Sequence, residues 1–127
     1  MTPDVSSVLY ELAQLLLRNA QPGLPEAERA NALTLSSMLL VVAAEVWDGA
    51  ADALVRENRA LAVLLDEVAA EDDLRLSVLR AENTRLRALL IAVQIDAERD
   101  GDVARQNGIW AELRASTERR LLSISLV

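Results

Sequence analysis

The chain has 127 residues and a formal net charge of −7, and it contains no cysteine, no histidine and no lysine. These absences exclude disulfide bonds, thiolate chemistry and Schiff-base chemistry, and they remove the commonest general base and metal ligand. Leucine (24) and alanine (21) are abundant whereas glycine (4) and proline (3) are scarce, so the composition predicts an all-α fold in a single domain over 1–127.

The charge distribution argues against nucleic acid as a partner, because acidic residues are in excess and the arginines are scattered along the chain. The longest apolar run, 38–44, is far shorter than the ~20 residues that a membrane span requires. No cationic segment with a cleavage site begins the chain. We therefore expect a cytoplasmic protein without a membrane span.

Four helices are expected in chain order, over 3–20, 26–70, 73–99 and 103–124. Thr2 suits the cap of the first helix, and the Pro-Gly-Leu-Pro stretch within 21–25 is the clearest break in the sequence. The acidic triplet at 71–73 and the Asp-Gly-Asp sequence at 100–102 supply the other stop and restart signals.

Gly49 lies inside the long second helix and has two interpretations. It allows a continuous helix that bends or approaches a neighbour closely, or it marks a kink after which Asp48 caps a fresh helix. The continuous helix is the favoured prediction.

A fifteen-residue pattern, L-x-x-E-N-x-x-L-x-x-L-L-x-x-V, occurs at 54–68 and again at 79–93. Its apolar residues are three and four apart, which is the spacing of one stripe on an α-helix. Each stripe contains one asparagine, Asn58 in the first copy and Asn83 in the second. The pattern predicts that both asparagines lie at a helix–helix seam.

An antiparallel hairpin with its turn near residue 72 accommodates both copies, with Asn58 facing Leu86 and Leu61 facing Asn83. One continuous helix is the alternative, because the four-residue frame shift between the copies is a stutter that a coiled coil can absorb. The sequence therefore predicts an antiparallel helical bundle of about four helices, with a long second helix and a coiled-coil-like hairpin.

The asparagines have a structural and a functional interpretation. A polar residue in an apolar seam often fixes the register of the helices, and this interpretation is favoured. The alternative is a polar ligand pocket inside the bundle. Such a pocket would be lined by Asn58, Asn83, Glu57, Glu82, Arg59 and Arg85.

Apolar residues exceed what a monomer of four short helices can cover, which predicts a homodimer. A helical segment of another protein is a second possible partner, bound in an aliphatic groove on the second helix. That groove is predicted to use Leu33, Met38, Leu39, Val42 and Val46.

No catalytic motif, cofactor site or metal-ligand set is present in the sequence, so no residue is assigned a catalytic or cofactor-binding role. The sequence favours a non-catalytic protein–protein interaction module: a scaffold, adaptor or chaperone-like protein. The alternative is a small-ligand sensor, or an enzyme of the helical-bundle type, with a polar site between helices.

Overall fold

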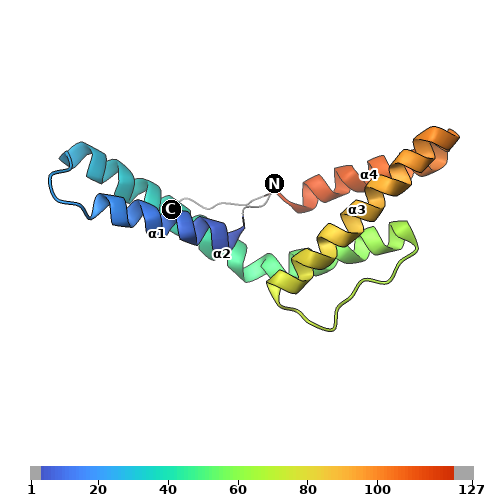
Figure 1. Cartoon of the computed structure of the whole chain (residues 1–127), viewed down its shortest axis with the longest axis horizontal. Helices are drawn as coiled ribbons and strands as arrows, with labels where there is room; N and C mark the ends of the chain where they lie inside the picture. The colour runs from blue at the N-terminus through green and yellow to red at the C-terminus, as the bar shows by residue number, and fades with distance from the viewer. Residues whose placement is uncertain (1–3, 122–127) are drawn as a thin grey trace. The chain divides into compact units, whose positions relative to one another are not determined.

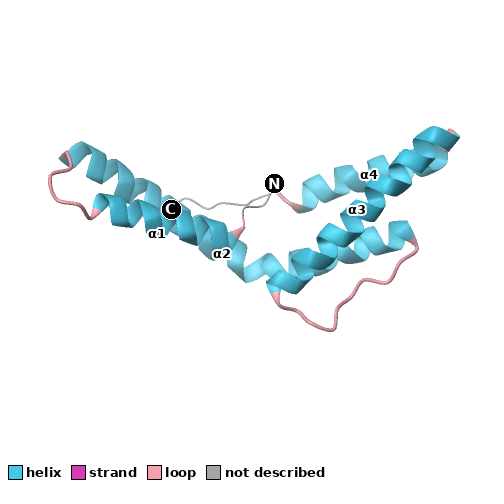
Figure 2. Ribbon diagram, in the orientation of Figure 1, coloured by secondary structure: helices cyan, strands magenta, loops and turns pink. Residues whose placement is uncertain are grey.

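The computed structural model describes residues 4–121, and within them the chain forms four α-helices and no strand (Figures 1 and 2). The helices are α1 (Val5–Asn19), α2 (Glu26–Leu65), α3 (Leu76–Asp100) and α4 (Val103–Arg119). The all-α prediction is confirmed, with the second helix the longest. The described residues divide into two compact units, one up to Gly49 and the other Ala50–Leu121. A single domain over 1–127 stays a prediction, since α2 contributes to both units.

In the first unit, α1 packs against the first part of α2 as a helical hairpin (Figure 1). The Asp4 carboxylate caps α1 by accepting hydrogen bonds from the Ser7 backbone N–H (3.3 Å) and hydroxyl (2.9 Å). The helix thus begins after Asp4 and not at residue 3, and the expected cap Thr2 lies outside the described residues. The small core of this unit consists of Val5, Ala43 and Val46, with Val8 and Val42 packed on it.

The second helix passes through Gly49 without a break, which confirms the continuous helix through that residue. It ends at Leu65 instead of near residue 70, because Asp66 adopts the left-handed conformation (φ 54°). The Glu67 N–H then reaches back to the Ala62 carbonyl (2.9 Å), and the Asp66 N–H to the Val63 carbonyl (3.4 Å), which is the hydrogen-bonding pattern of a Schellman motif.

Ten residues, 66–75, then form a non-helical segment before α3 begins at Leu76. The expected start at residue 73 is wrong, because Asp73 turns its carboxylate toward Arg75 and accepts a hydrogen bond from the Arg75 backbone N–H (3.0 Å). The alternative of one continuous helix through α2 and α3 is excluded by this segment.

The second part of α2 and α3 run in the same sense, and segment 66–75 leads from the end of α2 back to the start of α3 (Figure 1). Asn58 of α2 contacts Asn83 of α3. Glu67, just beyond the end of α2, places its Oε2 3.7 Å from Nη1 of Arg85, so moving forward along α2 also means moving forward along α3. The segment then runs backward, since the Ala70 N–H donates to Glu82. The predicted α2–α3 pairing, with Asn58 opposite Leu86 and a turn at residue 72, is therefore wrong.

In the second unit, the helix that runs antiparallel to α2 is α4. Gly101 leaves α3 in the left-handed conformation (φ 68°), and Asp102 caps α4 by accepting from the Arg105 N–H (3.0 Å). Ser116, near the end of α4, reaches Glu57, whereas Gly108 lies against Leu64, so α4 runs opposite to α2. The helix ends at Arg119, before the expected residue 124, which lies outside the described residues.

The core of the second unit gathers leucines from both copies of the repeat. Leu61 and Ala62 of α2 pack with Leu86 and Leu90 of α3 and with Ile109 of α4. Leu86 is fully buried and Ile109 nearly so. The repeated stripes thus face each other across α2 and α3, and α4 covers them.

Candidate functional site

The carboxylate of Glu57 is almost fully buried, with the side chain 6% exposed, and it joins three helices. The Nη2 atoms of Arg87 and Arg120 each lie 2.8 Å from its Oε1, and Ser116 Oγ lies 2.7 Å from the same oxygen. The Nη2 of Arg119 lies 3.1 Å from Oε2. Because Arg87 belongs to α3 and the other donors to the end of α4, this carboxylate ties α2 to both helices.

Three guanidinium groups around Glu57 leave an excess of positive charge at this point. Arg119 is shared with a second carboxylate, that of Glu112. The arginine side chains are 31–36% exposed, so water reaches their outer edges and stabilises the remaining charge. The arrangement holds helices together by charge-assisted hydrogen bonds.

The two asparagines form a direct hydrogen bond inside the same interface. Asn83 Nδ2 donates to Asn58 Oδ1 at 2.9 Å, and Asn58 Nδ2 donates to the Leu79 carbonyl at 3.1 Å. Arg87 Nε donates to Asn83 Oδ1 at 2.8 Å, which connects the asparagines to the Glu57 cluster. The predicted seam position of both asparagines is therefore observed, although each faces a different residue from the one expected.

The contacts between α2 and α3 follow the repeat in parallel register. Asn58 and Asn83 occupy equivalent positions of the two copies, and both lie at position a of a heptad. Glu57 is at g and Arg87 is at e of the following heptad, which are the positions that form ion pairs between parallel coiled-coil helices. Sequence reasoning missed Arg87, although the repeat would have identified it once the helices were known to be parallel.

Glu82, the counterpart of Glu57 in the second copy, is also buried but has a smaller set of donors. Arg85 binds it through two nitrogens at 2.8 and 2.9 Å, and the Ala70 N–H donates to it at 3.2 Å. The hydrogen bonds from Arg85 hold the pKa of Glu82 below the ordinary value of a glutamate, against the opposing effect of burial. Glu82 thereby fastens segment 66–75 to α3.

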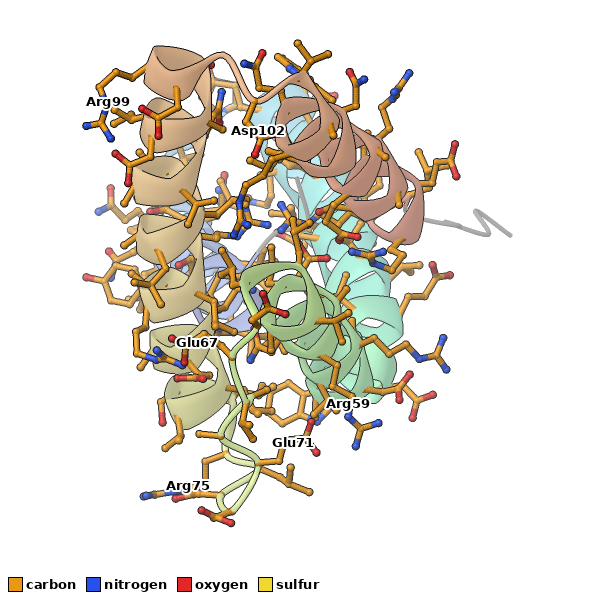
Figure 3. All side chains as sticks on the ribbon, turned by 90° about the vertical axis from the view of Figure 1, so that its right-hand side faces the viewer. Arg59, Glu67, Glu71, Arg75, Arg99 and Asp102 are labelled. Carbon is orange, nitrogen blue, oxygen red and sulfur yellow. The ribbon has the colours of Figure 1, made fainter. Side chains whose placement is uncertain are left out.

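Arg59, which was expected to join the asparagines, instead points outward to the segment. It makes a bidentate pair with Glu71, with distances of 2.6 and 2.8 Å (Figure 3). The Arg59 guanidinium holds the pKa of Glu71 below the usual range. Of the six residues predicted for a polar pocket, Asn58, Asn83 and Glu57 thus share one network, while Glu82 with Arg85, and Arg59, belong to two others.

A shallow, open hollow of about 230 Å³ lies where α3 ends and α4 begins. It is lined by Val93, Asp96, Ala97, Asp100, Asp102 and Arg105. Asp102 caps α4, and both Asp96 and Asp100 pair with Arg99. Within residues 4–121, no group of three or more acidic side chains is arranged to hold a metal ion.

The five residues predicted for an aliphatic groove do not share one exposed surface. Val46 is buried in the α1–α2 core, and Val42 packs on that core. Leu39 is half-buried, whereas Leu33 and Met38 are exposed. Two of the five residues, Val42 and Val46, therefore lie at the contact with α1, whereas Leu33 and Met38 are exposed on α2. The aliphatic groove itself stays a prediction.

A different apolar surface is exposed on the first unit. On α2, Leu33, Leu40 and Trp47 recur every seven residues and are 54%, 51% and 61% exposed. On α1, Leu9 and Leu16 show the same spacing and are also exposed. Residues seven apart lie on one side of a helix, so each helix carries an exposed stripe beside the stripe that packs on its neighbour. We call these five residues the α1–α2 face.

Comparison with known protein families, curated proteins and solved structures finds no match to this chain. Among the described residues, no helix combines the length and the apolar character needed to cross a bilayer.

Proposed function

We propose that this chain is a non-catalytic helical interaction module, of the scaffold, adaptor or chaperone-like kind, that binds a helix through the α1–α2 face. The supporting observation is the exposure of Leu33, Leu40 and Trp47 at seven-residue spacing. Scattered exposed leucines are ordinary on soluble proteins, but a contiguous apolar stripe is typical of an interaction surface. A cytoplasmic location and coiled-coil-like pairing with the partner accompany this proposal.

The spacing of the stripe favours a helix as the bound element. Side chains at i, i+4 and i+7 form ridges and holes that accept the knobs of another helix, and this is how amphipathic helices bind grooves. Small residues, Ser37 and Ala44, separate the large ones on α2 and leave room for such knobs. Two helices alone cannot bury this surface, because it lies outside their mutual contact.

The alternative of a small-ligand sensor or helical-bundle enzyme has less support. Asn58, Asn83 and Glu57 direct their polar atoms at one another and at nearby arginines and backbone groups. A ligand would have to break these hydrogen bonds to enter, and each lost bond to a buried polar group is costly.

A capture experiment from extract of the native host tests the proposed function. The wild-type chain is compared with Leu40→Asp, which places a charge in the α1–α2 face, and with Met38→Asp as the matched control. Met38 is exposed on the same helix (44%) but lies outside the face. We expect the same bound proteins, including the chain itself, with wild type and Met38→Asp, and their loss with Leu40→Asp. Equal retention by all three forms would remove the support for this surface.

A further inference from the structure

We propose that the α1–α2 face is occupied by a second copy of this chain, and that two hairpins form an antiparallel four-helix bundle. This inference rests on the proposed function, because it names the partner of the same surface. Three features of the first unit support it. Both stripes lie on the same side of the hairpin, large and small residues alternate along the α2 stripe, and the midpoints of the two stripes lie at the same level along the hairpin.

Both exposed stripes lie on the same side of the hairpin. On α2, the positions that contact α1 include Ala43 and Val46, and Ala44 and Trp47 follow one residue later. On α1, Val8 packs on the hairpin core and Leu9 follows it. Each stripe is therefore rotated by about 100° in the same rotational sense from its contact stripe. Because the two helices run in opposite directions, equal rotations bring both stripes to one side.

Large and small residues alternate along the exposed stripe of α2. Leu33, Leu40 and Trp47 occupy one heptad position, whereas Ala30, Ser37 and Ala44 occupy the other. In an antiparallel pair these two positions face each other. Leu40 of one copy then packs on Ser37 of the other, Leu33 on Ala44, and Trp47 on Ala30. A parallel pair would instead set large residues against large ones and leave gaps between the small ones.

The α1 stripe supports the same two-fold axis. If Leu9 pairs with Ala13 and Leu16 with Ser6 of the second copy, the two-fold axis crosses α1 at the midpoint of these pairs, level with Glu11. By the same rule, the α2 pairs place the axis between residues 38 and 39. In the hairpin core, Val5 and Val8 of α1 pack with Val42, Ala43 and Val46 of α2. These contacts place Glu11 level with residues 38–39, so one axis serves both helices.

Charge and register also favour a second copy. Residues 30–44 of α2 contain no charged side chain, so pairing this stretch with itself buries no unpaired charge. The heptad register that sets Asn58, Leu61 and Leu65 in the α2–α3 interface continues back through Trp47, Leu40 and Leu33. The exposed stripe is thus an extension of a register that already forms a helix–helix interface in this chain.

The first test is the mass in solution by sedimentation equilibrium or light scattering. We expect the wild-type chain and Met38→Asp to show twice the chain mass of 13.9 kDa at micromolar concentration. Leu40→Asp should raise the dimer dissociation constant by about a hundredfold or more, because it buries a carboxylate on each side of the axis. A monomeric wild-type chain at about 50 μM would overturn the proposal that a second copy occupies the α1–α2 face. If that monomer still captured another protein through Leu40, the proposed function would stand without it.

Cysteine cross-linking tests the register without disturbing the fold, since the natural chain has no cysteine. In the double variant Leu33→Cys with Ala44→Cys, the two thiols lie about 16 Å apart on one helix and cannot bridge within a chain. We expect mild oxidation to give a covalent dimer from this variant. Leu33→Cys alone should stay monomeric under denaturing conditions, because the antiparallel register separates its two thiols by about 16 Å. A covalent dimer from Leu33→Cys alone, or none from the double variant, would overturn the antiparallel register.

Discussion

Replacing Glu57 by glutamine should destabilise the second unit, because the substitution keeps the side-chain volume but removes the charge that attracts three arginines. Glu57 accepts hydrogen bonds from Arg87, Arg119, Arg120 and Ser116. Removing one partner of a buried ion pair costs about 3–5 kcal/mol. Since the arginines are 31–36% exposed, water compensates part of this loss. We therefore expect a decrease of about 2–3 kcal/mol in the free energy of unfolding, which corresponds to roughly 10–20 °C in Tm for a unit of this size.

The assay is urea denaturation followed by circular dichroism, with Glu118→Gln as an exposed control on α4. The control should change the unfolding free energy by less than about 0.5 kcal/mol. Added sulfate should restore part of the loss in Glu57→Gln, because an anion can bind the arginines that have lost their carboxylate. A loss below about 0.5 kcal/mol in Glu57→Gln would refute the reasoning, since it would mean that the buried carboxylate contributes no more than an exposed one.

Three further predictions concern the paired asparagines, two glycines and the pH dependence of Glu82. Asn83→Leu alone should lower the unfolding free energy by about 1–3 kcal/mol because it leaves Asn58 Oδ1 without this donor, whereas Asn58→Leu with Asn83→Leu should lose less or gain stability; additive losses in a double-mutant cycle would contradict this. Gly101→Ala should cost about 1 kcal/mol because of its φ of 68°, while Gly49→Ala, within a helix and facing open space, should gain about 0.5–1 kcal/mol; thermal melts that shift in the same direction would be inconsistent with these conformations. Because Arg85 lowers the pKa of Glu82, the stabilisation from Glu82 is complete above about pH 4.3 and is lost as the pH falls through its folded-state pKa. In urea titrations, Glu82→Gln should therefore lower the unfolding free energy less at about pH 3.5 than at about pH 6, and equal losses at the two pH values would contradict this prediction.

Local features of the fold could be predicted from the sequence because local rules decide them. The break at 21–25, the Asp-Gly-Asp restart before α4 and the continuity of α2 through Gly49 are all observed. The early end of α2 was missed, because Asp66 takes a left-handed conformation for which glycine or asparagine is the usual signal.

The direction of α3 relative to α2 could not be predicted because it depends on the path of segment 66–75. An acidic triplet is compatible with a tight turn, which would make the helices antiparallel. It is equally compatible with an extended, exposed segment that runs back along the helices, which makes them parallel. The repeat alone does not decide between these arrangements, since a stripe of leucines packs in either.

The partners of Glu57 were hidden for the same reason and for one more. Arg87 can be identified only when the helices are known to be parallel. Arg119 and Arg120 are 62 and 63 residues away in sequence, and their position at a helix end already has a sufficient local explanation in the helix dipole. No short-range pattern reveals that they fold onto a buried carboxylate.

Segment 66–75, between α2 and α3, has a consequence for protein engineering. The alignment of α2 and α3 is set by the Asn58–Asn83 hydrogen bond and the Glu57–Arg87 ion pair. The middle of segment 66–75, at Asp72, therefore does not determine it. Doubling the length of a flexible loop costs only about 0.6 kcal/mol. An epitope tag, or a small domain with adjacent termini, can therefore be grafted at Asp72 with both helices still in place.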